Sequence, residues 1–310
     1  MKEKHKKYLK FILKLLVSLA FVAWLVLKID WKSVLTYTEH ISLLQIILYV
    51  AVLIFGMVIS AYKWRILAEE KKFNLPLISY FQYYLAGTFI NNFFPSFIGG
   101  DTYRAYQIGR AEKRYSAAAA TVVMDRITGL LGAMVLSIFF AILNWRVILG
   151  HHVLLVILII VAGILLGVSV LGPITRLGIW KHFSKYVPKK IQEVIKDFAD
   201  YRGTAAIWQS MLGAIIYSLI GLALVNYVLF WAMGIKIGAL DYLTVIFLIS
   251  IVSSIPVSVN NIGIKEWAYV TFFGFFGVSA AAVVTVSLVS RVLQMIVSFT
   301  ALPNYLKNKK

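Results

Sequence analysis

The sequence NNFFPSFIGGD (residues 91–101) interrupts an apolar region with proline, glycine and a carboxylate, and PVSVNNIGIKE (residues 256–266) interrupts a second apolar region with the same kinds of residue. In a lipid bilayer, every backbone N–H and C=O group needs a partner inside the protein. Such a break is therefore stable only where it is buried in protein or lines a wet cavity. Because paired breaks in two corresponding halves point to a transporter's substrate site, we expect the functional site at these two segments.

The composition is that of an integral membrane protein. Of the 310 residues, 61% are hydrophobic, against about 45–50% in an ordinary soluble domain, and the mean hydropathy is +0.84. The sequence has no cysteine, which excludes disulfides and thiolate metal sites. The formal net charge of +18 indicates membrane topology and contact with anionic lipid rather than a nucleic-acid partner.

Six apolar runs approach or exceed the roughly 18 residues that span a bilayer. They cover residues 10–28, 41–62, 116–143, 151–173, 206–234 and 279–303. Residues 1–14 contain six lysines before the apolar stretch 15–27, and no small-x-small cleavage site follows. We therefore interpret the first run as an uncleaved first helix and not as a signal peptide. The two interrupted regions, 77–100 and 241–277, are predicted to be re-entrant helical hairpins.

Residues 176–202 separate the fourth run from the fifth. They contain apolar residues at i, i+3, i+4 and i+7 with lysines on the other face, which predicts an amphipathic helix on the cytoplasmic membrane surface. A plain solvated loop is the alternative.

The basic residues predict the orientation. If both interrupted regions re-enter, 24 of the 31 lysines and arginines fall in cytoplasmic segments, namely residues 1–14, 63–73, 101–115, 176–202 and 307–310. This places both termini in the cytoplasm. We therefore expect an all-α polytopic membrane protein with one domain over residues 1–310, six transmembrane helices and two re-entrant hairpins in the cytoplasmic membrane.

The two halves of this layout predict an inverted-topology repeat, residues 41–143 and 206–303. A single sequence offset, 165, aligns Asp101 with Glu266 and also aligns Arg126 with Arg291.

Charged residues inside the apolar segments are the candidate site. Asp125 and Arg126 lie about ten residues into their span, roughly 15 Å deep at ~1.5 Å per residue, where ionised groups pair or face a wet cavity. Neighbours on a helix point about 100° apart, so these two are expected to reach different partners. The expected partners are Arg291 or Lys265 for Asp125, and Asp101 or Glu266 for Arg126. Such pairs either lock helices together or bind substrate, and a guanidinium suits bidentate phosphate recognition.

The glycines of the two breaks predict helix starts. Gly99 and Gly100 precede Asp101 and Thr102, either of which can cap a helix that begins there, and glycine lets a ligand approach the backbone. A helix beginning here would direct its N–H groups at an anion, with Arg104 in its first turn. A second start is expected at Gly263, Ile264, Lys265 and Glu266.

Paired carboxamides flank each break. Asn91 with Asn92, and Asn260 with Asn261, either satisfy the broken backbone or bind a head group. Asn226, in mid-span, is expected to form a helix–helix hydrogen bond. Six tryptophans near span ends are interpreted as membrane-interface anchors: Trp24, Trp31, Trp64, Trp145, Trp180 and Trp208.

Several chemical signatures are absent from the sequence. It contains no Gly-x-x-x-x-Gly-Lys-Ser/Thr loop for ATP and no His-Glu-x-x-His zinc motif. We therefore expect no cofactor and no metal, and no catalytic residue is identified.

The motifs at the breaks resemble a known family. The sequence resembles the lysylphosphatidylglycerol-synthase transmembrane family, also called flippase-like domain proteins. The resemblance rests on four stretches: Asn92 through Pro95 to Gly99-Gly100-Asp101 and Arg104, then Asp125-Arg126, then Pro256, and then Asn261 to Glu266. In larger members such as the multiple peptide resistance factor, this region translocates lipid and precedes a cytosolic domain that transfers lysine from tRNA to phosphatidylglycerol. The present 310 residues contain no such domain. The resemblance implies lipid transport and antibiotic resistance, and an anionic or aminoacylated phospholipid or a polyprenyl-linked glycolipid as partner.

The residues and the resemblance together predict a lipid flippase. The predicted substrate-binding residues are Asn92, Gly99, Gly100, Asp101, Arg104, Asp125, Arg126, Asn260, Asn261, Gly263, Lys265, Glu266 and Arg291. The alternatives are a membrane lipid-modifying transferase such as a phosphatidylglycerol lysyltransferase, or its membrane subunit, and a scaffold or a transporter of another solute. The sequence leaves the oligomeric state open, a homodimer included.

Overall fold

The computed structural model of the chain describes residues 29–93, 98–110, 112–174, 203–255 and 261–307, with Tyr201, Ser258 and a few positions between 16 and 27. Every regular element in these residues is helical, as the predicted all-α membrane fold requires. Almost all of the predicted surface helix 176–202 and of the predicted span 10–28 lies outside the described residues.

Four helices are long and apolar enough to cross a membrane, and they confirm four of the six predicted spans. They are α3 (Leu43–Glu70), α6 (Tyr115–Leu143), the continuous helix Ala205–Ala232 and α15 (Ala280–Phe299). The third of these consists of α11 (Ala205–Tyr217), the π-helical segment η3 (Ser218–Leu224) and α12 (Val225–Ala232). The predicted span 151–173 is the helix α8 (His152–Ile174).

Each interrupted region folds as two packed helices. The first contains α4 (Leu77–Asn91) and α5 (Ile98–Gly109), and the second contains α13 (Ala239–Ser253) and α14 (Ile264–Gly274). The first hairpin therefore ends at Gly109 and not at Gly100 as predicted. Short helices join or flank these elements: α2 (Trp31–Glu39), α7 (Trp145–Gly150) and α16 (Leu302–Lys307). That the hairpins re-enter the bilayer stays a prediction.

The helices of the first half recur in the second half in the same order. The long helices that begin at Leu43 and Ala205 have the same length, and so do α4 and α13. A sequence offset of 162 relates the starts of both pairs. Beyond the breaks, α6 starts at Tyr115 and α15 at Ala280, so the offset there is 165. The break of the second half is therefore slightly longer. The inverted orientation of the halves stays a prediction.

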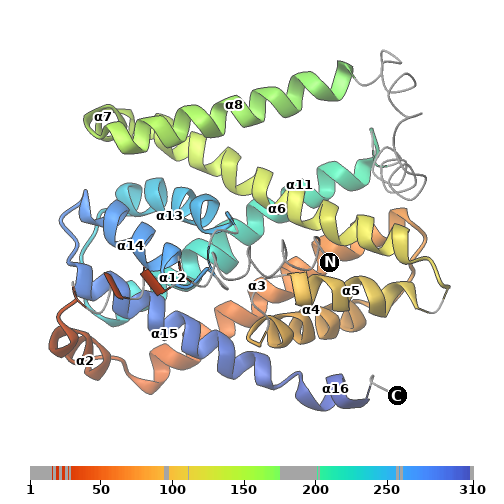
Figure 1. Cartoon of the computed structure of the whole chain (residues 1–310), viewed down its shortest axis with the longest axis horizontal. Coiled ribbons are helices and arrows are strands. Elements are labelled where there is room, and N and C mark those ends of the chain that lie inside the picture. The colour runs from red at the N-terminus through yellow and green to blue at the C-terminus, as the bar shows by residue number, and fades with distance from the viewer. Residues whose placement is uncertain are drawn as a thin grey trace.

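The halves pack against each other through their long helices and through their hairpins (Figure 1). Helix α11 lies against α3 and α6. Helix α13 lies against α6, and α4 lies against α15. The aromatic side chains of Phe247, Phe272 and Phe273 are fully buried in the largest apolar cluster. Helix α3 crosses η3 so closely that a Cβ atom on Gly56 would lie 2.6 Å from the Cα atom of Gly221, a contact that only small residues permit.

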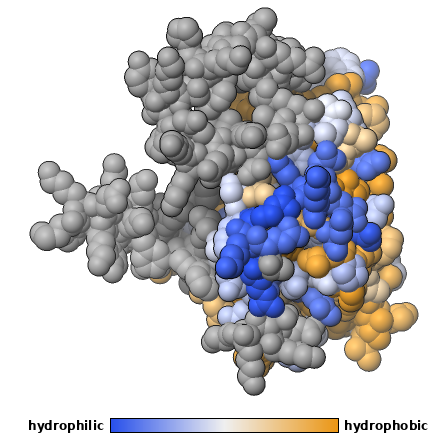
Figure 2. Space-filling view, turned by 90° about the vertical axis from the view of Figure 1, so that its right-hand side faces the viewer, coloured by the Kyte–Doolittle hydropathy of each residue, from blue (hydrophilic) through white to orange (hydrophobic). Residues whose placement is uncertain are grey.

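One end of the molecule is hydrophilic. Figure 2 shows polar side chains gathered on the face that lies at the right of Figure 1, with hydrophobic side chains at its rim. The connections α3–α4 and α5–α6 lie at this end, and their exposed charged residues are Glu70, Lys72, Arg110, Glu112 and Lys113. A charged face of this kind suits the water next to a membrane rather than its hydrocarbon interior.

Candidate functional site

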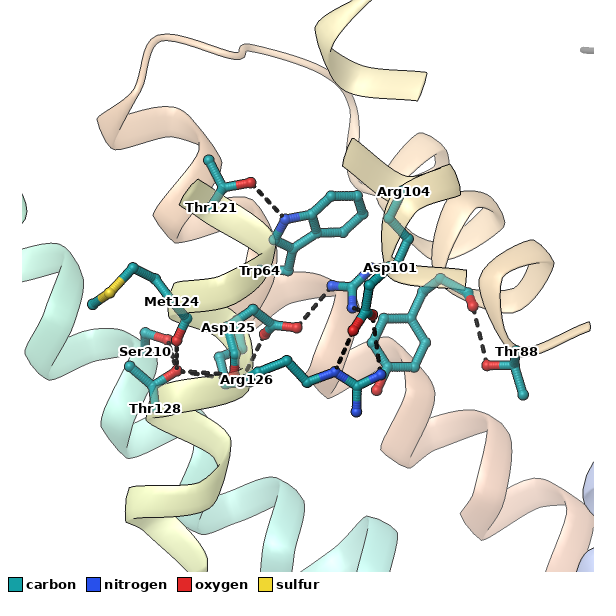
Figure 3. Close-up of polar contacts among 12 residues, drawn as sticks. Trp64, Thr88, Asp101, Arg104, Thr121, Met124, Asp125, Arg126, Thr128 and Ser210 are labelled. Atoms are coloured by element: carbon teal, nitrogen blue, oxygen red, sulfur yellow. Dashed lines mark hydrogen bonds and ion pairs between the residues drawn. The ribbon is translucent and has the colours of Figure 1, made fainter. Parts of the chain in front are cut away.

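A buried carboxylate lies between two cations near the first hairpin (Figure 3). The Asp125 Oδ1 atom on α6 is 2.6 Å from Lys63 Nζ on α3, and Arg104 Nη2 on α5 donates to Asp125 Oδ2 over 2.7 Å. All three side chains are at most 5% exposed. Removing one member of such a group leaves a buried charge unpaired, which strongly destabilises a fold. The triad therefore ties three helices together.

Aromatic rings enclose the Arg104 guanidinium. Its Cζ atom lies 4.2 Å from the ring centroid of Trp64 and 4.6 Å from that of Tyr84, so cation–π attraction adds to the ion pairs. The Trp64 indole donates to Thr121 Oγ1 over 3.0 Å and is fully buried. The prediction that Trp64 anchors the protein at the membrane interface is therefore wrong, because α3 continues beyond it to Glu70.

A second carboxylate joins this triad to the protein surface. Asp101 accepts two hydrogen bonds from Arg126, from Nε over 2.9 Å and from Nη2 over 3.0 Å, and a third from Arg104 Nη1 over 3.3 Å. The Arg126 side chain is 49% exposed, whereas that of Asp101 is 23% exposed. Arg126 is about eleven residues into α6, roughly 16 Å from its start at ~1.5 Å per residue, or about half of a ~30 Å hydrocarbon layer.

These contacts decide between the expected pairings. Asp101 was one of the two partners predicted for Arg126, and it is the one observed. The predicted partners of Asp125, Arg291 and Lys265, are wrong, because the carboxylate is already held by Lys63 and Arg104. As expected from their angular separation, Asp125 and Arg126 reach different partners.

A small cavity lies beside the Asp101–Arg126 pair. Its volume is about 30 Å³, and its lining includes Tyr84, Thr88 and Asn91 of α4 together with Asp101 and Arg104 of α5. A buried water needs roughly 10–15 Å³ of such space, so one or two waters fit. A lipid head group does not fit in this conformation.

The second hairpin holds a similar pair. Glu266 Oε1 on α14 accepts from Arg291 Nη2 on α15 over 3.1 Å and from Ser287 Oγ over 2.9 Å. Its Oε2 atom accepts from the Gly263 backbone N–H over 2.7 Å. Glu266 is 2% exposed and Arg291 is 30% exposed. The neighbouring Lys265 directs its Nζ atom to the Tyr269 ring, 5.5 Å from the centroid.

Neutral polar groups lie behind the Glu266–Arg291 pair, whereas ionised groups lie behind the Asp101–Arg126 pair. The Tyr269 hydroxyl donates to Asn226 Oδ1 over 3.1 Å, which confirms Asn226 as a helix–helix hydrogen-bonding residue. The hydroxyls of Ser290 and Tyr49 lie 2.9 Å apart and join α15 to α3. With the repeat offset of 165, Tyr269 and Ser290 stand where the first half has Arg104 and Asp125.

Carboxamides satisfy the backbone at both breaks. Asn91 Oδ1 accepts from the Gly100 N–H over 2.8 Å, and the Asn261 amide donates to the Ser253 carbonyl. These asparagines were expected either to satisfy the broken backbone or to bind a head group, and both contacts show the backbone role. Asn92 donates instead to Ser298 Oγ on α15 over 2.7 Å. Asn260 lies outside the described residues.

The glycines of the first break have a different role from the predicted one. Helix α5 begins at Ile98, so Gly99 and Gly100 lie in its first turn and neither Asp101 nor Thr102 is an N-cap. A Cβ atom on Gly100 would collide with the Gly87 carbonyl oxygen of α4. The glycine thus permits close packing of α5 on α4, and it also lines the small cavity beside Asp101. That a ligand approaches its backbone stays a prediction. At the second break the prediction is correct, because Gly263 is the N-cap of α14 with φ at 88°.

Sequence reasoning missed three polar members of the site. Lys63 was assigned to a cytoplasmic loop, yet it lies inside α3 and is 3% exposed. Its Nζ atom also donates to the Asp125 carbonyl over 2.6 Å, and the hydroxyls of Thr128 and Ser210 link the cluster to α11 over 3.0 Å. The buried residues Ser60, Lys63, Trp64 and Leu67 have helical spacing, and this periodicity was the available signal.

The described residues contain no group of three or more His, Asp or Glu side chains placed to hold a metal ion.

The long apolar helices and the buried charged cluster define a multi-pass membrane protein with ionised groups inside its helix bundle. The chain belongs to the family described as Lysylphosphatidylglycerol synthase TM region, which it matches over residues 11–301, in agreement with the resemblance of its motifs. It is similar to the UPF0104 membrane protein PH1989 of Pyrococcus horikoshii, with 25% identity over 314 aligned residues that cover 93% of this chain and 92% of that protein. No solved structure matches the chain.

Proposed function

We propose that the protein moves lipid head groups across the cytoplasmic membrane while the acyl chains stay in the bilayer, with both termini of the chain in the cytoplasm. The observation that carries this proposal is the half-exposed Arg126–Asp101 pair near the middle of a membrane-length helix. An ionised side chain at the bilayer centre costs at least about 2.5–3.5 kcal/mol, and such residues mark substrate or ion pathways. Arg126 can bind a phosphate bidentately in place of Asp101.

The charges favour a substrate with a phosphate. The first cluster contains three cations, Lys63, Arg104 and Arg126, and two carboxylates, Asp101 and Asp125, so its formal charge is +1. The second contains Lys265 and Arg291 with Glu266, which also gives +1. An anionic phospholipid is the first candidate. The carboxylates suit an aminoacylated phospholipid, and a polyprenyl-linked glycolipid also carries the required phosphate.

Transport requires the hairpins to move. The cavity beside Asp101 is about 30 Å³, which accommodates water but no head group. Helix α5 approaches α4 through Gly87 and Gly100, and its Arg104 and Asp101 connect it to α6 by ion pairs. We infer that a head group opens this gap by exchanging with the Asp101–Arg126 pair, and that α14 opens likewise at Glu266–Arg291.

A transport assay in proteoliposomes tests the proposal. Fluorescent phosphatidylglycerol is incorporated into both leaflets, and its flipping is followed with an impermeant quencher. Wild-type protein and the control Arg146→Ala, which removes an exposed arginine from α7, should flip at equal rates. Arg126→Ala and Glu266→Ala should flip at least about tenfold more slowly, equivalent to about 1.4 kcal/mol of barrier. Equal rates for all four proteins would contradict the proposal, and a new lipid species after expression would favour a transferase.

A further inference from the structure

An open cavity of about 760 Å³ lies where α12 meets α13, and its lining shares no residue with either ionic cluster. Three aromatic residues, Tyr227, Trp231 and Phe276, contribute to its walls together with two charged residues, Lys236 and Asp241. Its size falls within the roughly 300–1,000 Å³ of typical ligand sites. The connection that forms it lies at the left of Figure 1, at the end opposite the α5–α6 connection.

The turn between α3 and α4 in the first half corresponds to the turn between α12 and α13, and a side chain covers it. Helices α3 and α12 end in the same way, because the Phe73 N–H donates to the Ala68 carbonyl and the Ile235 N–H donates to the Phe230 carbonyl. The offset of 162 that relates α4 to α13 also relates these two hydrogen bonds. In the first half, Arg114 covers the turn. Its Nη2 atom donates to the Lys71 carbonyl over 2.8 Å, and its Cζ atom lies 4.8 Å from the Phe73 ring centroid.

The second half has a serine at the position of this arginine. At the offset of 165, Arg114 corresponds to Ser279, whose hydroxyl caps α15 by accepting from the Ala282 N–H over 3.2 Å. The turn between α12 and α13 is therefore open where its counterpart holds a guanidinium over an aromatic ring. Space, aromatic rings and a carboxylate remain, which is the combination that binds ammonium groups.

We propose that this cavity binds the head group of a phospholipid that carries both an amine and a phosphate. The ammonium lies against Tyr227 and Trp231 and pairs with Asp241, whose carboxylate is held in place by the Asn144 amide, which donates to Oδ1 over 2.8 Å. Lys236 pairs with the phosphate. The exposed Trp231 ring, 57% accessible, is of the kind that lies at head-group depth in membrane proteins. Binding here does not depend on transport through the two hairpins.

Native mass spectrometry of the detergent-purified protein tests the site, with phosphatidylethanolamine and phosphatidylglycerol of identical acyl chains as probes. The wild-type protein should bind phosphatidylethanolamine about fivefold more tightly, as expected for one cation–π and ion-pair contact of about 1 kcal/mol. Asp241→Asn should lose most of this preference, because the ion pair is removed while the aromatic rings remain, and it preserves the hydrogen bond from Asn144. The matched control Asp30→Asn, at the exposed start of α2, should retain the preference.

A second variant separates the two charged contacts. Lys236→Gln should weaken both lipids to the same extent and leave their ratio unchanged, because both carry the phosphate. Equal binding of the two lipids by wild-type protein, or an unchanged preference in a folded Asp241→Asn protein, would overturn the proposal. An unchanged affinity in Lys236→Gln would overturn its phosphate contact.

Discussion

The hairpin α4–α5 and the hairpin α13–α14 each place a carboxylate against an arginine on the next helix of the chain, Asp101 with Arg126 and Glu266 with Arg291. Behind the first pair lies a buried ionic triad, and behind the second lie neutral tyrosine, asparagine and serine groups. Both hairpins have the carboxylate–arginine pair in common, and we propose that this pair gates each hairpin. The triad is confined to the first half, where it ties α3, α5 and α6 together behind the Asp101–Arg126 pair.

The sharpest test of this difference removes one of the groups that lie behind each carboxylate–arginine pair. Asp125→Asn leaves Lys63 and Arg104 as buried cations without their carboxylate, so the free energy of unfolding should fall by about 3–5 kcal/mol. Ser290→Ala removes hydrogen bonds to neutral groups and should lower it by only about 1 kcal/mol. Reversible unfolding in mixed detergent micelles, followed by circular dichroism, measures both values. Equal losses would mean that the two halves do not differ in the way described.

The two carboxylate–arginine pairs should also differ in strength. Glu266 is 2% exposed and accepts from a backbone N–H as well as from Ser287 and Arg291. Glu266→Gln should therefore lower the free energy of unfolding by about 2 kcal/mol, within the range for an unsatisfied buried polar group. Asp101→Asn disturbs a pair that is partly solvent-exposed and should lower it by about 1 kcal/mol or less. The same unfolding assay applies, and a larger loss for Asp101→Asn would reverse the predicted order.

A smaller effect is expected where the first hairpin contacts the second half of the chain. Asn92→Ala removes one hydrogen bond to Ser298 on α15, and such bonds in membrane proteins contribute about 0.6 kcal/mol. Hydrogen exchange of the α4 amides should report this change as faster local opening near the break. Protection equal to that of the wild-type protein would show that this contact does not hold the hairpin to α15.

Local composition was sufficient to predict the breaks and most of the long helices. Proline, glycine and charge within apolar sequence need no knowledge of tertiary contacts, so both hairpins were found. The end of α3 was missed because a lysine at the end of an apolar run is typical of a cytoplasmic loop, whereas Lys63 is held inside by Asp125. The role of Gly100 depends on its contact with Gly87 of another helix, and no sequence pattern specifies that contact.

The same limit applies to the partners of charged residues. Arg126 and Asp101 lie on helices adjacent in the chain, and their pairing was among those predicted. The partners of Asp125 come from α3 and α5, and a choice among several cations requires the packing of three helices. The charges were therefore predictable as a set, but their pairing was not.

We propose that the space beside the Asp101–Arg126 pair opens to water and to head groups. Single introduced cysteines test this most directly, because the sequence contains no cysteine. Thr88→Cys places a thiol at the lining of this cavity, and Ser137→Cys places one at a fully buried site on α6. In proteoliposomes, an impermeant thiol reagent should modify Thr88→Cys, more slowly when short-chain phosphatidylglycerol is added, and should leave Ser137→Cys unmodified. A Thr88→Cys protein that is as unreactive as Ser137→Cys would contradict the account.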